Sequence, residues 1–291
     1  MAVPATVIDK FATLNGLRIH FLDWENLGAP AIVMLHGLRS YAHVWDGVAR
    51  PLAPDYRILA LDQRGRGDSD RDPAAGYNTE AYVSDLEQFV DSLGLDRFIL
   101  IGHSMGGANT IAYTARHPER VIAAVIEDMG PGSTSSAGSA RISRELEETP
   151  RRFNSWAEAE AFWRKQRPLI SDQALEERLR NTLKTGPDGG VIWKWDIEGI
   201  ERARNNPSPR LDLWPPVRSL QCPTLVVRGA LSDILPRETA EQMAGSNPSI
   251  RWVEVPNASH FVHEDNLEAF NREVGAFLSG LPLPSPLAGE G

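Results

Sequence analysis

The sequence has little cysteine, little basic charge and no long apolar run. Cys222 is the only cysteine among 291 residues, so an internal disulfide and a CxxC metal or redox motif are excluded. Thirty Lys and Arg stand against 39 Asp and Glu, a net charge of −9 that argues against a nucleic-acid partner. No run approaches the roughly 18 apolar residues of a membrane span, and the N-terminus lacks the pattern of a signal peptide. We therefore expect a cytoplasmic protein without a membrane partner, either a monomer or a homodimer.

Short apolar runs that alternate with helix-like segments predict an α/β fold. Asn15-Gly16 separates two alternating segments, which is the pattern of a β-hairpin. Segments 79–94 and 266–280 have the apolar period of helices. Six runs are apolar almost throughout, as parallel strands covered on both faces are: 31–35, 57–62, 97–102, 121–128, 224–229 and 250–255. We expect a mostly parallel, eight-stranded sheet that begins with an antiparallel hairpin.

One interval of the chain, residues 133–215, lacks comparable strand candidates. A Gly/Ser-rich stretch opens it and helix-like pieces follow. Five of the eight tryptophans lie in it: Trp156, Trp163, Trp193, Trp195 and Trp214. We interpret it as a helical cap inserted into a core formed by residues 1–132 and 216–280, followed by a disordered tail at 281–291. The hypothesis is that this cap excludes water and shapes the substrate pocket.

The candidate nucleophile is Ser104, in the stretch "GHSMGG" between a predicted strand and a predicted helix. A serine exposed at so sharp a turn needs a strained backbone, and only glycine fits easily two positions away, at Gly102 and Gly106. The N-terminus of the following helix favours negative charge beside the hydroxyl. A serine that merely caps the helix would share much of this pattern, so the rest of the chain must decide.

A serine nucleophile needs a base, and the base needs an acid that orients it. His260 follows the last predicted strand, and Asp233 follows the strand before it. Parallel strands bring such positions to one edge of the sheet, where open α/β sheets place their sites. Asp233 is therefore the expected acid. Asp128 also follows a strand and is the alternative, although it could instead line the hinge of the cap.

Two backbone N–H groups complete the expected constellation as an oxyanion hole. The strand at 31–35 ends in His36-Gly37, so the N–H of Leu38 can face the site. The N–H of Met105, directly after the nucleophile, is the second donor. Four elements, each placed after a strand and in the order oxyanion loop, serine, acid and histidine, predict acyl-transfer chemistry.

At this point the chain resembles the serine hydrolases of the α/β-hydrolase fold, over roughly residues 5 to 280. The motifs that carry the resemblance are "HGLRSYAHVW", "LDQRGRGDSD", "GHSMGG", "RGALSDILP" and "NASHFVHED". It is most similar to the capped microbial esterases, enol-lactonases, acylamide hydrolases and C–C bond hydrolases. The resemblance implies the roles given above for Ser104, Asp233, His260, Leu38 and Met105, and no cofactor or metal. Dehalogenases and epoxide hydrolases of this fold use Asp as nucleophile, so Ser104 argues against both.

Several further residues have two interpretations. Trp45, Arg39, Trp163 and Trp193 are candidates for contact with a small-molecule substrate, Arg39 through a substrate carboxylate. The alternatives are core packing for the tryptophans and a solvated side chain for Arg39. His103 is expected to be a packed neighbour, His36 a structural residue of the oxyanion loop and His263 a surface histidine. No metal motif accompanies His263.

The expected reaction is hydrolysis of a small carboxylic ester or lactone through an acyl-enzyme. An amide or C–C bond hydrolase would use the same triad, and the sequence does not separate these leaving groups. A cofactor-free haloperoxidase or perhydrolase is a further alternative. A small-molecule receptor that keeps the triad is the last, since the chain shows no partner motif.

Overall fold

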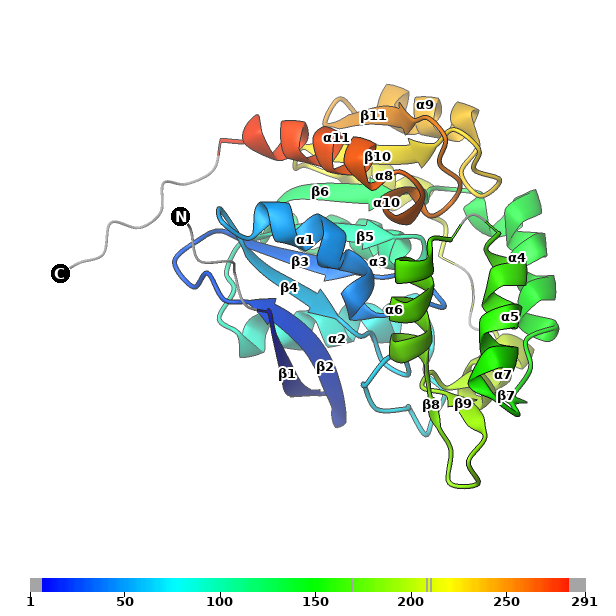
Figure 1. Cartoon of the computed structure of the whole chain (residues 1–291). Coiled ribbons are helices and arrows are strands. Elements are labelled where there is room, and N and C mark those ends of the chain that lie inside the picture. The colour runs from blue at the N-terminus through cyan, green and yellow to red at the C-terminus, as the bar shows by residue number, and fades with distance from the viewer. Residues whose placement is uncertain (1–6, 169, 208, 210, 283–291) are drawn as a thin grey trace.

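The computed structural model describes residues 7–168, 170–207, 209 and 211–282, and in this part of the chain an eight-stranded sheet forms the centre. Figure 1 shows the sheet with helices on both faces and a separate group of elements at one end. The strand order is β1-β2-β4-β3-β5-β6-β10-β11. Strand β2 is antiparallel to both neighbours, and the pairs from β4 to β11 are parallel. The predicted fold class is confirmed. Of the predicted tail, 283–291 lies outside the described residues.

The strand boundaries follow the apolar runs closely. The eight strands are β1 (Val7–Leu14), β2 (Leu17–Trp24), β3 (Ala31–Leu35), β4 (Arg57–Leu61), β5 (Phe98–His103), β6 (Val121–Glu127), β10 (Thr224–Gly229) and β11 (Ile250–Val255). The hairpin between β1 and β2 turns at Asn15 and Gly16, with φ of 49° and 79°. Both angles are those of a two-residue primed turn, which explains the Asn-Gly pair.

Helices cover the two faces of the sheet and bury it. They are α1 (Asp46–Leu52), α2 (Thr79–Ser92), α3 (Met105–Arg116), α8 (Trp214–Ser219), α9 (Arg237–Ser246), α10 (Val262–Asp265) and α11 (Leu267–Ser279), with the 3₁₀ helix η1 (Ala42–Trp45). In β3, Ile32 and Met34 pack with α1 and α11, whereas Val33 and Leu35 pack with α2 and α3. The side chains of one strand thus alternate between two apolar cores, as the period of two requires. No described helix is long and apolar enough to cross a membrane.

The interval between β6 and α8 forms the cap (Figure 1). Helix α8, in which the predicted cap would have ended at residue 215, instead packs with the core through Val217. The cap contains η2 (Ser133–Ser135), α4 (Ala137–Glu147), β7 (Arg152–Phe153), α5 (Trp156–Gln166), α6 (Asp172–Thr182), β8 (Leu183–Thr185), β9 (Val191–Trp193) and α7 (Ile197–Asn205). Strands β7, β9 and β8 form a small antiparallel sheet that the sequence did not predict. Two or three residues are too short to display a period, so the pattern showed only the helices.

Candidate active site

Ser104 lies on a strained turn between β5 and α3. Its backbone has φ 53° and ψ −117°, a left-handed conformation that side chains rarely adopt. A Cβ on Gly102 would lie 2.3 Å from the carbonyl oxygen of Gly106, and a Cβ on Gly106 would lie 2.1 Å from that of Leu35. Glycine is therefore required on both sides of Ser104, as the sequence predicted. The turn places the hydroxyl of Ser104 at the edge of the sheet where the parallel strands have their carboxyl ends.

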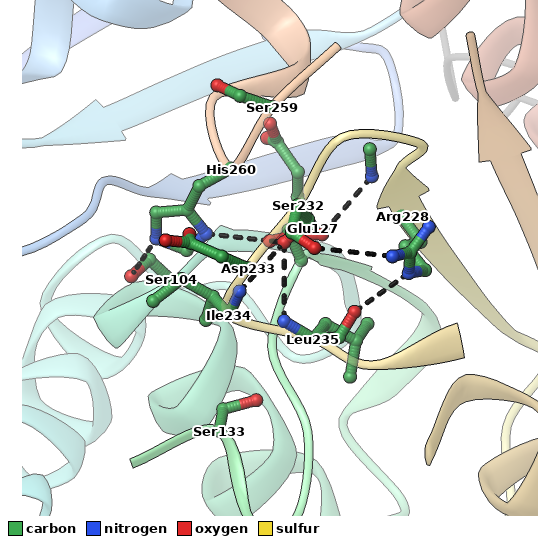
Figure 2. A network of polar contacts seen from close by, with 12 residues as sticks. Ser104, Glu127, Ser133, Arg228, Ser232, Asp233, Ile234, Leu235, Ser259 and His260 are labelled. Atoms are coloured by element: carbon green, nitrogen blue, oxygen red, sulfur yellow. Dashed lines mark hydrogen bonds and ion pairs between the residues drawn. The ribbon is translucent and has the colours of Figure 1, made fainter. Parts of the chain in front are cut away.

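Ser104, His260 and Asp128 form one continuous line of hydrogen bonds. The Oγ of Ser104 lies 2.8 Å from Nε2 of His260, a contact that Figure 2 shows from close by. The other ring nitrogen, Nδ1 of His260, lies 2.7 Å from Oδ2 of Asp128. Asp128 is fully buried and His260 nearly so. This geometry allows the imidazole to accept the serine proton while the carboxylate fixes its orientation.

Asp233 does not contact His260, and the expectation that it orients the base is wrong. Its carboxylate instead pairs with Arg141 of α4 through two hydrogen bonds of 2.9 Å. The side chain is 41% exposed, and Arg141 lowers its pKa. In the loop after β10, the hydroxyl of Ser232 hydrogen-bonds to Asp128. The next residue, Asp233, points toward the surface instead. The alternative acid, Asp128, occupies the place that Asp233 was expected to hold.

Asp128 is fixed by the loop that carries Asp233. Its Oδ1 accepts a hydrogen bond of 3.1 Å from the N–H of Gly229, and its Oδ2 accepts one from the hydroxyl of Ser232. Sequence reasoning missed Ser232 as a residue of the site. The available signal was its place beside Asp233 at the end of β10, but a hydroxyl there has no distinctive pattern.

The segments that carry the two expected oxyanion-hole N–H groups both adjoin Ser104. Met105 is the first residue of α3, so its N–H has no acceptor within the helix. A Cβ on Gly37 would lie 3.3 Å from Cβ of Ser104, which places the oxyanion loop directly against the serine. Arg66, which is fully buried, donates from Nε to the carbonyl of Leu38 at 3.0 Å and holds this loop.

Two further histidines brace the loops around the site. His36 donates from Nδ1 to the carbonyl of Gly37 and accepts from the N–H of Gln63, and burial lowers its pKa to about 4. His103 lies 2.8 Å from the carbonyl oxygen of His260 through Nε2. Burial is the main reason that the pKa of His103 lies well below its usual value, so this ring is neutral. The structural interpretations of His36 and His103 agree with these contacts.

His263 is not a surface histidine, and that expectation is wrong. It is buried, and its Nδ1 lies 2.8 Å from both carboxylate oxygens of Glu127, which is itself fully buried. Burial alone would lower the pKa of His263, but the carboxylate of Glu127 holds it above the usual value. Trp45 stacks on the imidazole with ring centroids 4.6 Å apart. Trp45 is fully buried among core residues, so the packing alternative holds for it rather than a place in the acyl pocket.

The cap candidates lie in two different environments. Trp193 packs in the aromatic core of the cap, and its indole N–H donates to the carbonyl of Pro150. Trp163 belongs to the same core but also contacts the main domain, because the guanidinium of Arg39 lies 5.8 Å from its ring; that of Arg178 in α6 of the cap lies 4.8 Å away. Arg39 is not solvated: its Nη2 donates to Glu145 of α4 at 2.6 Å. Among the described residues, no cluster of three His, Cys, Asp or Glu fits a metal ion.

A family model described as alpha/beta hydrolase fold matches residues 30–267. The chain belongs to this family. Its match extends from β3 to α11 and includes the cap, so it covers both Ser104 and His260. Several relatives carry hydrolase and esterase names, and together with the family this supports a hydrolytic enzyme.

Three comparisons show how near this alpha/beta hydrolase is to known proteins. It is 27% identical to a 2-(acetamidomethylene)succinate hydrolase of Mesorhizobium japonicum over 254 residues, 87% of this chain and 90% of the relative. It is 27% identical to the esterase YbfF of Escherichia coli K12 over 250 residues, 85% of this chain and 92% of the relative. A crystal structure of an E-2-(acetamidomethylene)succinate hydrolase superposes with a TM-score of 0.83 and 25% identity, covering 94% of this chain and all of that one.

Proposed function

We propose that the protein is a serine hydrolase that cleaves a small carboxylic ester or lactone through an acyl-enzyme. The observation that carries this proposal is the line of hydrogen bonds from Ser104 through His260 to Asp128. A serine hydroxyl is a weak nucleophile at neutral pH, and an adjacent imidazole oriented by a carboxylate is the arrangement that activates it. The buried, multiply hydrogen-bonded carboxylate of Asp128 meets that requirement.

In the first half-reaction, the Oγ of Ser104 attacks the carbonyl carbon while Nε2 of His260 takes the hydroxyl proton. Asp128 accepts a hydrogen bond from the N–H at Nδ1 and stabilises the imidazolium that forms. The N–H groups of Leu38 and Met105 receive the oxyanion of the tetrahedral intermediate. When the intermediate collapses, the bond from carbon to the alcohol oxygen breaks and His260 gives its proton to the leaving alcohol.

The second half-reaction reverses the roles of these groups. His260 takes a proton from a water molecule, and the resulting hydroxide attacks the acyl carbon under the same two N–H groups. The bond to Oγ breaks, the proton returns to Ser104 and the carboxylic acid leaves. None of these steps requires an oxidant, a metal or a cofactor, and the partner in this proposal is a small-molecule substrate.

Amide hydrolysis is the second candidate function. The name of the similar Mesorhizobium protein contains an acetamido group, which favours amide substrates as the alternative. The same three side chains serve this reaction, because His260 then protonates a leaving nitrogen instead of an oxygen. The line from Ser104 to Asp128 does not by itself distinguish the two leaving groups.

Labelling of the nucleophile tests the proposal. A fluorophosphonate should form one adduct on Ser104, located by mass spectrometry of the digested protein. Ser104→Ala should lose the label and turnover of 4-nitrophenyl esters, since triad loss typically costs ~10⁴- to 10⁶-fold in kcat. Ser279→Ala, on the exposed surface of α11, is the matched control and should behave as wild type. A label on another residue would contradict the assignment, and a panel of lactones and anilides ranks the leaving groups.

A further inference from the structure

Paired charges line the seam between the cap and the core. Arg39, one residue after the proposed oxyanion donor Leu38, pairs with Glu145 of α4. Arg178 of α6 pairs with Glu264 of α10, and Arg167, just after α5, contacts Glu264 at 2.8 Å. These residues meet although more than 80 positions separate the cap and core members of each pair. We call Arg39, Arg167 and Arg178 the seam arginines.

The seam arginines gather on aromatic rings that border the site. The Cζ atoms of Arg178 and Arg39 lie 4.8 Å and 5.8 Å from the centroid of the Trp163 ring. The Cζ of Arg167 lies 3.7 Å from the centroid of Phe261, the residue that follows the base His260. The three guanidiniums therefore lie beside the loop of Gly37 and the loop of His260, the two segments that lie against Ser104.

Three N–H groups of this cluster are buried and have no acceptor among the residues that the structure describes. They are Nε of Arg178, Nη1 of Arg167 and Nε1 of Trp163. The side chain of Arg178 is only 2% exposed. A buried donor without an acceptor is costly, and more so when it is charged. One acceptor of the cluster, Oε2 of Glu264, also has no hydrogen bond within the described residues, but it already forms an ion pair of 2.8 Å with Nη2 of Arg167. The three donors therefore need acceptor atoms from another group.

The chemistry of these donors favours an anionic acceptor. Arg167 and Arg178 both pair with Glu264, and Arg167 also lies 3.3 Å from Asp265, yet one guanidinium N–H of each arginine still has no acceptor in the described part of the chain. The pKa of Arg39 falls to about 10, mainly through burial, and the charges of Arg178 and Arg141 add repulsion that opposes the attraction of Glu145. The planar fork of a guanidinium matches a carboxylate in two parallel hydrogen bonds, which a neutral carbonyl does not form.

We propose that Arg167 and Arg178, supported by Arg39, bind a second carboxylate of the substrate, so that the enzyme selects acyl groups that end in a carboxylate. The inference rests on the proposed function and adds the substrate class. Binding there anchors the far end of the acyl chain while its ester carbonyl lies at Ser104. The seam arginines thereby determine which acyl groups bind, and the triad carries out the hydrolysis.

Two esters that differ only at their far end test the inference. The 4-nitrophenyl monoester of adipic acid carries a free carboxylate, and its methyl ester is the neutral match. We expect the wild type to favour the acid by at least tenfold in kcat/KM, through KM. Arg178→Gln and Arg167→Gln should each bring this ratio toward one. Arg164→Gln removes the same charge from exposed α5 and is the control that should keep the ratio.

Two additional measurements keep the inference independent of folding and of turnover. Arg178→Lys retains the positive charge but loses the planar guanidinium, so its ratio of kcat/KM for the acid over the methyl ester should also fall. Thermal unfolding of this variant checks that its fold is intact. Calorimetric titration of Ser104→Ala with adipate should show binding that is at least tenfold weaker when Arg178→Gln is added. Equal kcat/KM for the two esters in the wild type would overturn the inference alone. Failure to cleave either ester would instead contradict the proposed function, and adipate binding would then still decide the carboxylate site.

Discussion

Replacing Asp128 by Asn tests the link between the tautomer of His260 and catalysis. The carboxylate of Asp128 accepts from three donors: Nδ1 of His260, the hydroxyl of Ser232 and the N–H of Gly229. In Asp128→Asn, one oxygen becomes an NH₂ group that must face one side or the other. The N–H of Gly229 cannot change its role, whereas the hydroxyl of Ser232 rotates and an imidazole exchanges tautomers.

The favoured orientation therefore keeps the remaining oxygen at Gly229 and turns the NH₂ group toward His260. Nδ1 of His260 then becomes the acceptor, and the ring proton moves to Nε2, which can no longer take the proton of Ser104. Loss of the correct tautomer costs about 10⁴ in kcat, which corresponds to about 5.4 kcal/mol of transition-state stabilisation. Because the substitution conserves shape and removes one charge, we expect little change in the fold.

The assay is the steady-state hydrolysis of a neutral 4-nitrophenyl ester, with thermal unfolding measured alongside. Asp233→Asn is the matched control: it removes the same charge at the end of β10 but breaks only a partly exposed ion pair with Arg141. Such pairs contribute about 0–1 kcal/mol to stability, and Asp233 contacts neither Ser104 nor His260, so kcat should fall by less than about tenfold. A nearly normal Asp128→Asn enzyme together with a dead Asp233→Asn enzyme would refute the reasoning.

Two further predictions concern the frame of the site. Gly106→Ala should unfold at markedly lower urea concentration than the wild type, or fail to fold, because its Cβ would lie 2.1 Å from the Leu35 carbonyl oxygen. Gly245→Ala is the control: its Cβ on exposed α9 would contact no described residue, and it should stabilise the fold by about 0.4–1 kcal/mol. Equal urea midpoints for the two variants would contradict the steric argument. The second concerns Glu127, which raises the pKa of His263 above its unfolded value of 6.5, so the stability from this pair is present below pH 6.5 and is lost as pH rises through the folded pKa. The melting temperature of the wild type should therefore exceed that of Glu127→Gln most near pH 6 and by less at pH 9, and a gap that widens with pH would reverse the assigned sign.

Much of the fold and part of the site could be read from local patterns. The runs 31–35, 224–229 and 250–255 are the strands with the predicted bounds, because burial on both faces makes a parallel strand apolar at nearly every position. The turn around Ser104 was also predictable, since a strained backbone and close packing each require glycine at specific spacing. In such cases the physical cause acts between residues that are near in sequence.

The sequence alone did not decide which side chains meet across the sheet. Asp128 and Asp233 both follow strands, and the sequence favoured Asp233, but only Asp128 turns inward, where the Gly229 N–H and Ser232 complete its hydrogen bonds. His263 likewise looked exposed because its partner Glu127 lies 136 residues away. Strand ends bring many polar residues to one edge of the sheet. Which carboxylate faces which imidazole depends on side-chain directions and burial, and only the packed tertiary structure determines these.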